Sequence, residues 1–115
     1  MQTLEEWILA LKQSKKLIIV EGKKDKKALQ TLGINNIITL NPNPIYKIIE
    51  KIAENNKECV LLFDLDREGK KFYSVMKHQL QKHKVKVDRK FREFLFKKTK
   101  LTQIEGLINY LKNAN

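Results

Sequence analysis

The chain has 115 residues, enough for one hydrophobic core and too few for two, so we expect a single domain. Its hydrophobic fraction of 42% argues against disorder, and no apolar run approaches the roughly 20 residues that cross a bilayer. We therefore expect no membrane partner. With 24 Lys and Arg against 13 Asp and Glu, the net charge is +11, which favours a polyanionic partner such as nucleic acid. A lysine-rich proteome would give the same charge, so the charge alone does not establish the partner.

Four short apolar runs predict strands. The first run, Leu17 to Val20, is apolar throughout, as expected for a parallel strand that helices cover on both faces. The predicted strands are residues 17–21, 37–40 and 60–63, with a marginal fourth strand at 85–87.

Amphipathic segments between these runs predict helices. The first begins with a capping-box pattern from Thr3 to Glu6, and the second ends at Gly33, where a left-handed cap is favoured. The alternation of strands and helices with short links implies a parallel sheet joined by right-handed helical crossovers. The predicted helices span residues 3–14, 25–32, 44–55, 69–83 and 104–111, with a helical turn near residues 91–95.

The amino-terminal residues and the single cysteine bear on the compartment. Glu5 and Glu6 interrupt any signal-peptide pattern early. Cys59 lies in an expected buried strand and cannot form an internal disulfide. We therefore expect a cytoplasmic protein.

Acidic residues follow two of the predicted strands. Glu21 ends the first strand, and the run Asp64-Leu65-Asp66-Arg67-Glu68-Gly69 follows the third. In a parallel sheet, the carboxyl ends of neighbouring strands converge on one crevice. Carboxylates gathered there repel each other unless a cation lies among them, and oxygen ligands of this kind suit Mg²⁺.

A simpler structural explanation exists for the same residues. Asp66 or Glu68 could cap the helix that follows, and an Asp-x-Asp pattern alone favours that explanation. Glu21 makes a metal site the favoured explanation, because a buried strand rarely ends in an uncompensated acid. Asp25 is interpreted more simply as a helix N-cap.

Basic residues crowd beside these acids. Arg67 can bind a phosphate bidentately, and the helix N-terminus after it offers free N–H groups. Lys23, directly after Glu21-Gly22, is a second phosphate-binding cation. The residues expected to contact nucleic acid are Lys23, Arg67, Lys70, Arg89, Lys90 and Arg92.

Two of these motifs resemble those of the Toprim domain, which type IA topoisomerases, bacterial-type primases and the ribonuclease that matures 5S ribosomal RNA share. They are Glu21-Gly22 after the first strand and Asp64-Leu65-Asp66 after the third. The resemblance covers about residues 16–88 of a single domain, 1–115, that adds an N-terminal helix and a basic C-terminal helical extension. It implies an α/β, Rossmann-like Toprim fold, a central parallel sheet of about four strands with helices on both faces.

The resemblance also implies the roles of the site residues. Glu21 would be the general acid or base, and Glu21, Asp64, Asp66 and Glu68 would hold Mg²⁺ directly or through water. Glu68 is included because the run looks most like the topoisomerase version. We add Lys23 and Arg67 as catalytic residues that hold the reacting phosphate.

The chain further resembles small stand-alone prokaryotic Toprim proteins. Arg92 and the stretch Ile104-Glu105-Gly106-Leu107 fit their outline. Glu105 could be a further site acid, although a surface helix acid is the simpler interpretation.

These residues favour one function and leave others open. A topoisomerase needs a tyrosine nucleophile in a larger domain, and one Cys with two His cannot build the structural zinc site that a primase needs. We expect Mg²⁺-dependent phosphodiester chemistry, as a nuclease or RNA-processing enzyme, with RNA slightly favoured over DNA. The alternative is a non-catalytic nucleic-acid-binding subunit of a larger replication, repair or RNA-processing complex, with protein partners of its own. A response-regulator-like domain is a third hypothesis, opposed by the basic charge and by the single acid at the first strand end.

Overall fold

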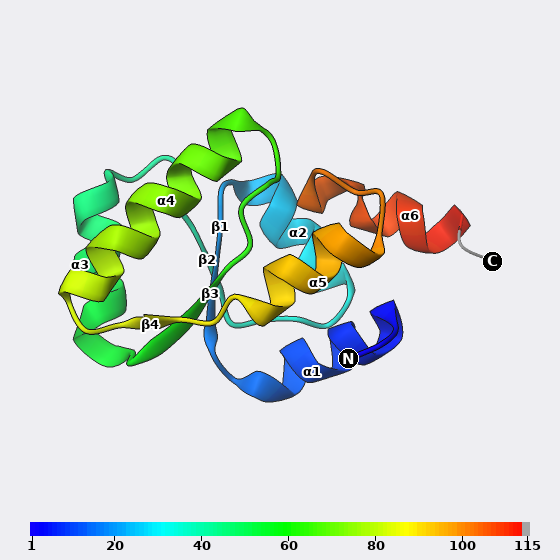
Figure 1. The fold of residues 1–115 in the computed structure, drawn as a ribbon, viewed down its shortest axis with the longest axis horizontal. Coiled ribbons are helices and arrows are strands. Elements are labelled where there is room, and N and C mark those ends of the chain that lie inside the picture. The colour runs from blue at the N-terminus through cyan, green and yellow to red at the C-terminus, as the bar shows by residue number, and fades with distance from the viewer. Residues whose placement is uncertain (114–115) are drawn as a thin grey trace.

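The computed structural model describes residues 1–113 and has an α/β fold built on one sheet (Figure 1). All strand pairs are parallel, and their order across the sheet is β2-β1-β3-β4. The expected α/β architecture with a four-stranded parallel sheet is therefore confirmed. The strands are β1 (Leu17–Val20), β2 (Ile37–Thr39), β3 (Glu58–Leu61) and β4 (Lys86–Val87).

Helices link the strands and extend the chain beyond the sheet. None of the helices within residues 1–113 is long and apolar enough to cross a membrane. The last two residues of the predicted domain, 114–115, lie outside the described residues. The helices are α1 (Leu4–Ser14), α2 (Lys23–Thr31), α3 (Ile45–Asn55), α4 (Arg67–Lys82), α5 (Lys90–Lys98), the 3₁₀ turn η1 (Ile104–Gly106) and α6 (Leu107–Asn113).

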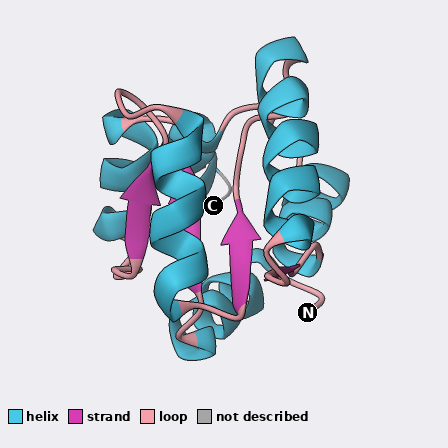
Figure 2. Ribbon diagram, turned by 90° about the vertical axis from the view of Figure 1, so that its left-hand side faces the viewer, coloured by secondary structure: helices cyan, strands magenta, loops and turns pink. Residues whose placement is uncertain are grey.

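Alternate residues of the central strands pack into two separate cores. On one face, Ile18 and Val60 belong to a cluster with residues of α1, α2, α5 and α6. On the other face, Ile19 and Leu61 pack against α3 and α4. Figures 1 and 2 show the two helical layers with the sheet between them. Because both faces are covered, β1 and the part of β3 after Glu58 carry no polar alternation, which is why the sequence shows continuous apolar runs there.

The strand order creates a switch point between β1 and β3. From β1 the chain moves outward to β2, then returns past β1 to form β3 on its other side. In open α/β sheets of this kind, the crevice outside the carboxyl ends of the two strands at the switch point is the usual ligand site. Glu21 and Asp64 follow these two strands.

The segment after α4 packs against the N-terminal helix α1 through α5. Trp7 of α1 is fully buried and donates its indole N–H to the carbonyl oxygen of Phe91 in α5 at 2.8 Å. The predicted helix 104–111 divides into η1 and α6.

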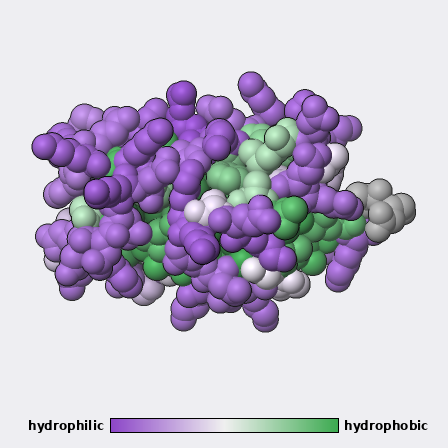
Figure 3. All heavy atoms as spheres, turned by 90° about the horizontal axis from the view of Figure 1, so that it is seen from below, coloured by the Kyte–Doolittle hydropathy of each residue, from purple (hydrophilic) through white to green (hydrophobic). Residues whose placement is uncertain are grey.

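The surface of the molecule is mainly hydrophilic, with an apolar band visible from below (Figure 3).

Candidate metal centre

A cavity of about 570 Å³ opens at the carboxyl ends of β1 and β3. Six of its eleven lining residues are acidic, although the chain as a whole carries a net charge of +11. Close approach of several carboxylates is unfavourable without a cation among them. The lining acids are Glu21, Asp25, Asp64, Asp66, Glu68 and Glu105.

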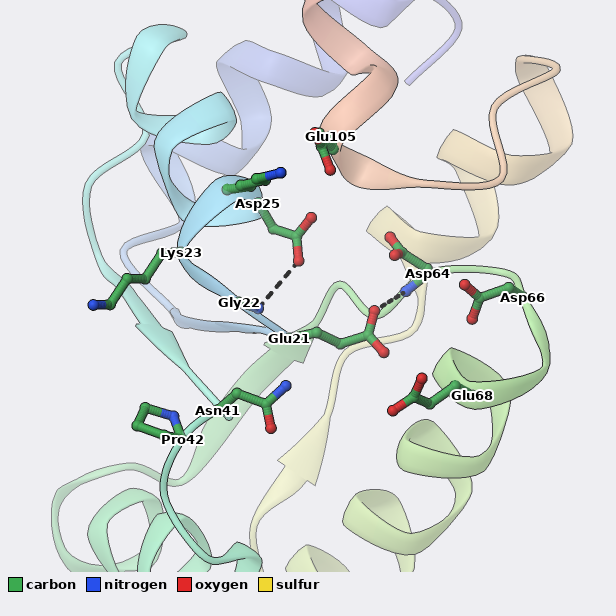
Figure 4. A pocket seen from close by; sticks show the side chains of 11 residues that line it. Glu21, Gly22, Lys23, Asp25, Asn41, Pro42, Asp64, Asp66, Glu68 and Glu105 are labelled. Carbon is green, nitrogen blue, oxygen red and sulfur yellow. Dashed lines mark hydrogen bonds between the residues drawn. The ribbon is translucent and has the colours of Figure 1, made fainter.

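Three of these acids form a compact group. Glu21, Asp25 and Asp64 each offer a carboxylate oxygen, and the three oxygens lie within 4.8 Å of one another. Figure 4 shows the three side chains converging from the end of β1, the first turn of α2 and the loop after β3. Oxygen-only donor sets of this kind suit Mg²⁺, Ca²⁺ or Mn²⁺. The group can therefore hold a divalent metal ion.

Main-chain N–H groups orient each carboxylate of this group. Glu21 Oε2 accepts from Asp64 N–H at 3.3 Å, and Asp25 Oδ2 accepts from Gly22 N–H at 3.1 Å. Asp64 Oδ1 accepts from Ile104 N–H at 2.8 Å. Such outer contacts fix the direction of metal ligands before an ion arrives.

The pKa values of two of these acids are raised. Burial, with further contributions from neighbouring Asp64, raises the pKa of Glu21 to about 7. Burial and the charge of Asp64 raise the pKa of Asp25 to about 6. Both shifts arise because a half-buried crevice disfavours additional negative charge, and a bound cation would reverse that preference.

Asp66 and Glu68 lie on the same cavity but outside the compact group. Asp66 is the N-cap of α4, and its Oδ1 accepts from Gly69 N–H at 2.8 Å. Glu68, in the first turn of that helix, points toward the space in front of Glu21 (Figure 4). Capping and metal binding are compatible for Asp66, since a carboxylate has two oxygens. Metal binding by Asp66 and Glu68 remains a prediction.

The acidic loop and α4 are in unusually close contact at Gly69. A Cβ atom at this position would lie 2.1 Å from the carbonyl oxygen of Asp64. Only glycine permits this approach, which places the N-terminus of α4 directly against the loop that carries Asp64.

The predicted basic residues are distributed around the cavity. Lys23 lines it, but its ammonium group points away from the carboxylates (Figure 4). Arg67 and Lys70 are exposed in the first turns of α4, and the described lining residues do not include either. Arg89 and Lys90 are exposed at the start of α5, away from the cavity lining. Nucleic-acid contacts by these residues remain predictions.

Arg92 points inward. Its Nε and Nη2 donate to the carbonyl oxygens of Phe63 and Asp64, each at 3.0 Å. The guanidinium lies over the ring of Tyr73, 4.5 Å from the centroid. The structure therefore joins Arg92 to the acidic loop, a contact that the sequence interpretation did not include.

The predicted role of Asp25 as an N-cap is wrong. Gly22 is the N-cap of α2, and Asp25 is the third helical residue, 8% exposed and part of the acidic group. The helix begins two residues earlier than expected because Gly22 serves as the cap. A Glu-Gly-x-x-Asp spacing across a strand end and a helix start would have indicated that both acids face one crevice.

Glu105 also lines the cavity, although the simpler interpretation placed it on a helix surface. It is exposed and lies in η1, across the opening from Asp25 (Figure 4). Its position depends on the turn that begins at Ile104, whose N–H is bound to Asp64.

Comparison with known proteins identifies the family. The sequence model of the Toprim domain matches residues 15–90. The chain belongs to the Toprim domain family, as the motifs after the first and third strands indicated. A nucleic-acid-related, metal-dependent function follows from the family and the acidic group together.

Within this family the chain is similar to a group named UPF0292. It is 31% identical to the UPF0292 protein MJ1624 of Methanocaldococcus jannaschii, over 96% of this chain and 88% of that protein. It is 36% identical to the UPF0292 protein PYRAB04740 of Pyrococcus abyssi, over 83% of this chain and 74% of that protein. A solved structure of a protein from Aquifex aeolicus matches with a TM-score of 0.86 and 36% identity, over 91% of this chain and 98% of that one.

Proposed function

We propose that this protein is a Mg²⁺-dependent enzyme that acts on phosphodiester bonds of nucleic acid, as a nuclease or RNA-processing enzyme, with RNA favoured over DNA. The observation that carries the proposal is the group formed by Glu21, Asp25 and Asp64 at the switch point of a strongly basic chain. Mg²⁺ bound there would draw negative charge from the scissile phosphate.

Other steps of the reaction would depend on the side chains in and around the cavity. Glu21 would move a proton from its place within the ion-binding group, where its carboxylate adjoins those of Asp25 and Asp64. Asp64, Asp66 and Glu68 would complete the metal ligands, directly or through water. Lys23, which lines the cavity, and the exposed Arg67 and Lys70 of α4 would hold the phosphate backbone.

The test is cleavage of a panel of labelled structured RNAs, single-stranded RNAs and DNAs with Mg²⁺ or with EDTA. Cleavage should require Mg²⁺ and should fall by at least about 100-fold in Asp64→Ala and Glu21→Gln proteins. Glu54→Gln, which neutralises an exposed acid on α3, is the matched control and should retain full activity. Undiminished cleavage by the Asp64→Ala and Glu21→Gln proteins would refute the site assignment.

The same panel distinguishes the alternative of a non-catalytic subunit. Stoichiometric nucleic-acid binding without turnover, unchanged by Mg²⁺, would favour a binding role within a larger complex. Salt dependence does not separate the two functions, because phosphate contacts weaken with salt in both.

A further inference from the structure

The loop that carries Asp64 continues beyond the part of the sheet that β4 covers. The last main-chain bond from the β4 side is Asp88 N–H to the carbonyl oxygen of Cys59. The carbonyl oxygens of Phe63 and Asp64 therefore need donors from elsewhere, because buried main-chain groups are rarely left unpaired. Arg92 supplies both bonds through Nε and Nη2, each at 3.0 Å.

The guanidinium of Arg92 is itself held in one orientation. Its central carbon lies over two aromatic rings, 4.5 Å from the centroid of Tyr73 and 5.4 Å from that of Phe96. Its planar fork spans two consecutive carbonyl groups, a geometry that a lysine ammonium cannot reproduce. The three residues come from α4 and α5 and are all partly buried.

The chain after α5 adds two more contacts to the same loop. Leu65 N–H donates to the carbonyl oxygen of Thr102 at 2.7 Å. Ile104 N–H donates to Oδ1 of Asp64 at 2.8 Å, which orients the carboxylate within the acidic group. The main chain of Asp64 is thus held by Arg92 and its side chain by Ile104.

Arg92 and Ile104 both lie beyond residues 15–90, the part that the Toprim family model matches. We propose that Arg92 is a positioning residue of the metal site and that, with the turn at Ile104, it makes the C-terminal extension a working part of that site. The inference rests on the proposed metal binding by Glu21, Asp25 and Asp64. It assigns Arg92 to the acidic loop instead of to the nucleic-acid backbone.

Positioning and simple electrostatics predict opposite effects of removing this side chain. Arg92 interacts through its charge with Glu21 and Asp64, so it disfavours a further cation in the cavity. If charge alone mattered, Arg92→Met would strengthen metal binding. If positioning matters, the same substitution weakens it, because loss of a contact that orients metal ligands typically lowers affinity about 10- to 100-fold.

The experiment measures Mn²⁺ affinity of the full chain by electron paramagnetic resonance, with competition by Mg²⁺. Mn²⁺ is used because it prefers oxygen ligands as Mg²⁺ does. Arg92→Met and the charge-conserving Arg92→Lys should both bind Mn²⁺ about tenfold or more weakly than the wild type. Lys97→Met, which removes an equal charge from an exposed position on the same helix, should change the affinity less than twofold.

Circular dichroism at the same temperature confirms that each variant is folded when affinity is measured. If Arg92→Met does not fold, the comparison of Arg92→Lys with the wild type decides the question. Unchanged or tighter Mn²⁺ binding by the folded Arg92 variants, with a wild type that binds, would overturn the positioning role and leave the proposed function intact. A wild type that does not bind Mn²⁺ would overturn both.

Discussion

Two groups of charged side chains lie at opposite ends of β1 and β3. At the amino ends, Lys16 Nζ lies 2.6 Å from Asp88 Oδ2 and 3.2 Å from Glu58 Oε1. At the carboxyl ends, Glu21, Asp25 and Asp64 gather with main-chain N–H groups as their partners. The first group contains its own cation, and the second presents its carboxylates to the cavity.

The pKa shifts at the two ends have opposite signs. Burial alone would raise the pKa of Asp88, but hydrogen bonds from Lys16 and from Lys90 N–H outweigh burial and hold it below its ordinary value. The pKa values of Glu21 and Asp25 are raised, with burial as the main cause. A buried acid that the fold has paired is stabilised when ionised, whereas one that the fold leaves facing other acids is not. This difference separates a structural charge cluster from a candidate binding site.

The largest effect is expected at the close contact between α4 and the acidic loop. Gly69→Ala would drive a methyl group into the carbonyl of Asp64, so it should lower the free energy of unfolding by about 3 kcal/mol. Urea denaturation measures this loss. Divalent metal binding should weaken in parallel, because the main chain of Asp64 must shift to relieve the clash.

Gly22→Ala is the matched control for this substitution. Gly22 also borders the cavity, but a Cβ atom there would meet nothing within 4 Å, and its φ of −144° suits any residue. The expected loss is about 1 kcal/mol or less, from the weaker N-cap preference of alanine. Equal losses in the two variants would show that the contact at Gly69 is not what holds the loop.

Replacing one carboxylate with a neutral amide of the same shape should have different effects on stability at the two ends. Asp88→Asn should lower the free energy of unfolding by about 2 kcal/mol, because it leaves the partly buried ammonium of Lys16 with one carboxylate partner fewer. Asp64→Asn, in buffer with EDTA, should cost about 0.5 kcal/mol or less, since it relieves repulsion among the acids. Thermal or urea unfolding of both variants tests the difference.

Added Mg²⁺ provides a second test of the difference between the two ends. It should stabilise the wild type and the Asp88→Asn protein by binding the folded state, and it should stabilise Asp64→Asn far less. Similar costs for both substitutions, with no selective loss of the Mg²⁺ effect, would remove the distinction between the two ends.

The sequence predicted the acidic crevice because its evidence is local. An apolar run followed by Glu21, and another followed by Asp64, mark two strand ends, and parallel strands bring such ends together. The four strands and their parallel arrangement follow from the same pattern. The N-cap prediction for Asp25 is wrong because α2 begins two residues earlier than expected. Local propensity does not define helix ends to that precision.

The contacts made by the C-terminal extension could not be predicted in this way. Arg92 stands in a basic run, and its spacing does not distinguish a side chain that faces solvent from one that bonds to Asp64, 28 residues earlier. The pair of Lys16 and Asp88 spans 72 residues and depends on where β4 lies beside β3. Such contacts depend on how helices and strand ends pack in three dimensions.

The smallest predicted effect is a pH dependence of opposite sign at the two ends. Raised pKa values mean that the folded state binds protons more tightly at Glu21 and Asp25 than the unfolded chain does. In metal-free buffer, this pair should therefore make the free energy of unfolding fall as pH rises from about 4.5 toward 7. The other charged groups around the pair are Lys23, Lys24, Asp64, Asp66, Glu68, Arg92 and Glu105.

The partial exposure of the crevice limits the size of this pH-dependent loss of stability. Solvent screening limits the fall to about 1 kcal/mol for the two acids together. Urea denaturation between pH 5 and pH 8 should show a steeper loss in the wild type than in a Glu21→Gln, Asp25→Asn double variant. Asp88 contributes nothing to this difference, because its lowered pKa confines its effect to pH values below the ordinary range for aspartate. Mg²⁺ binds the ionised acids and should flatten or reverse the wild-type slope, whereas identical slopes in wild type and double variant would mean that the crevice imposes no cost on its charges.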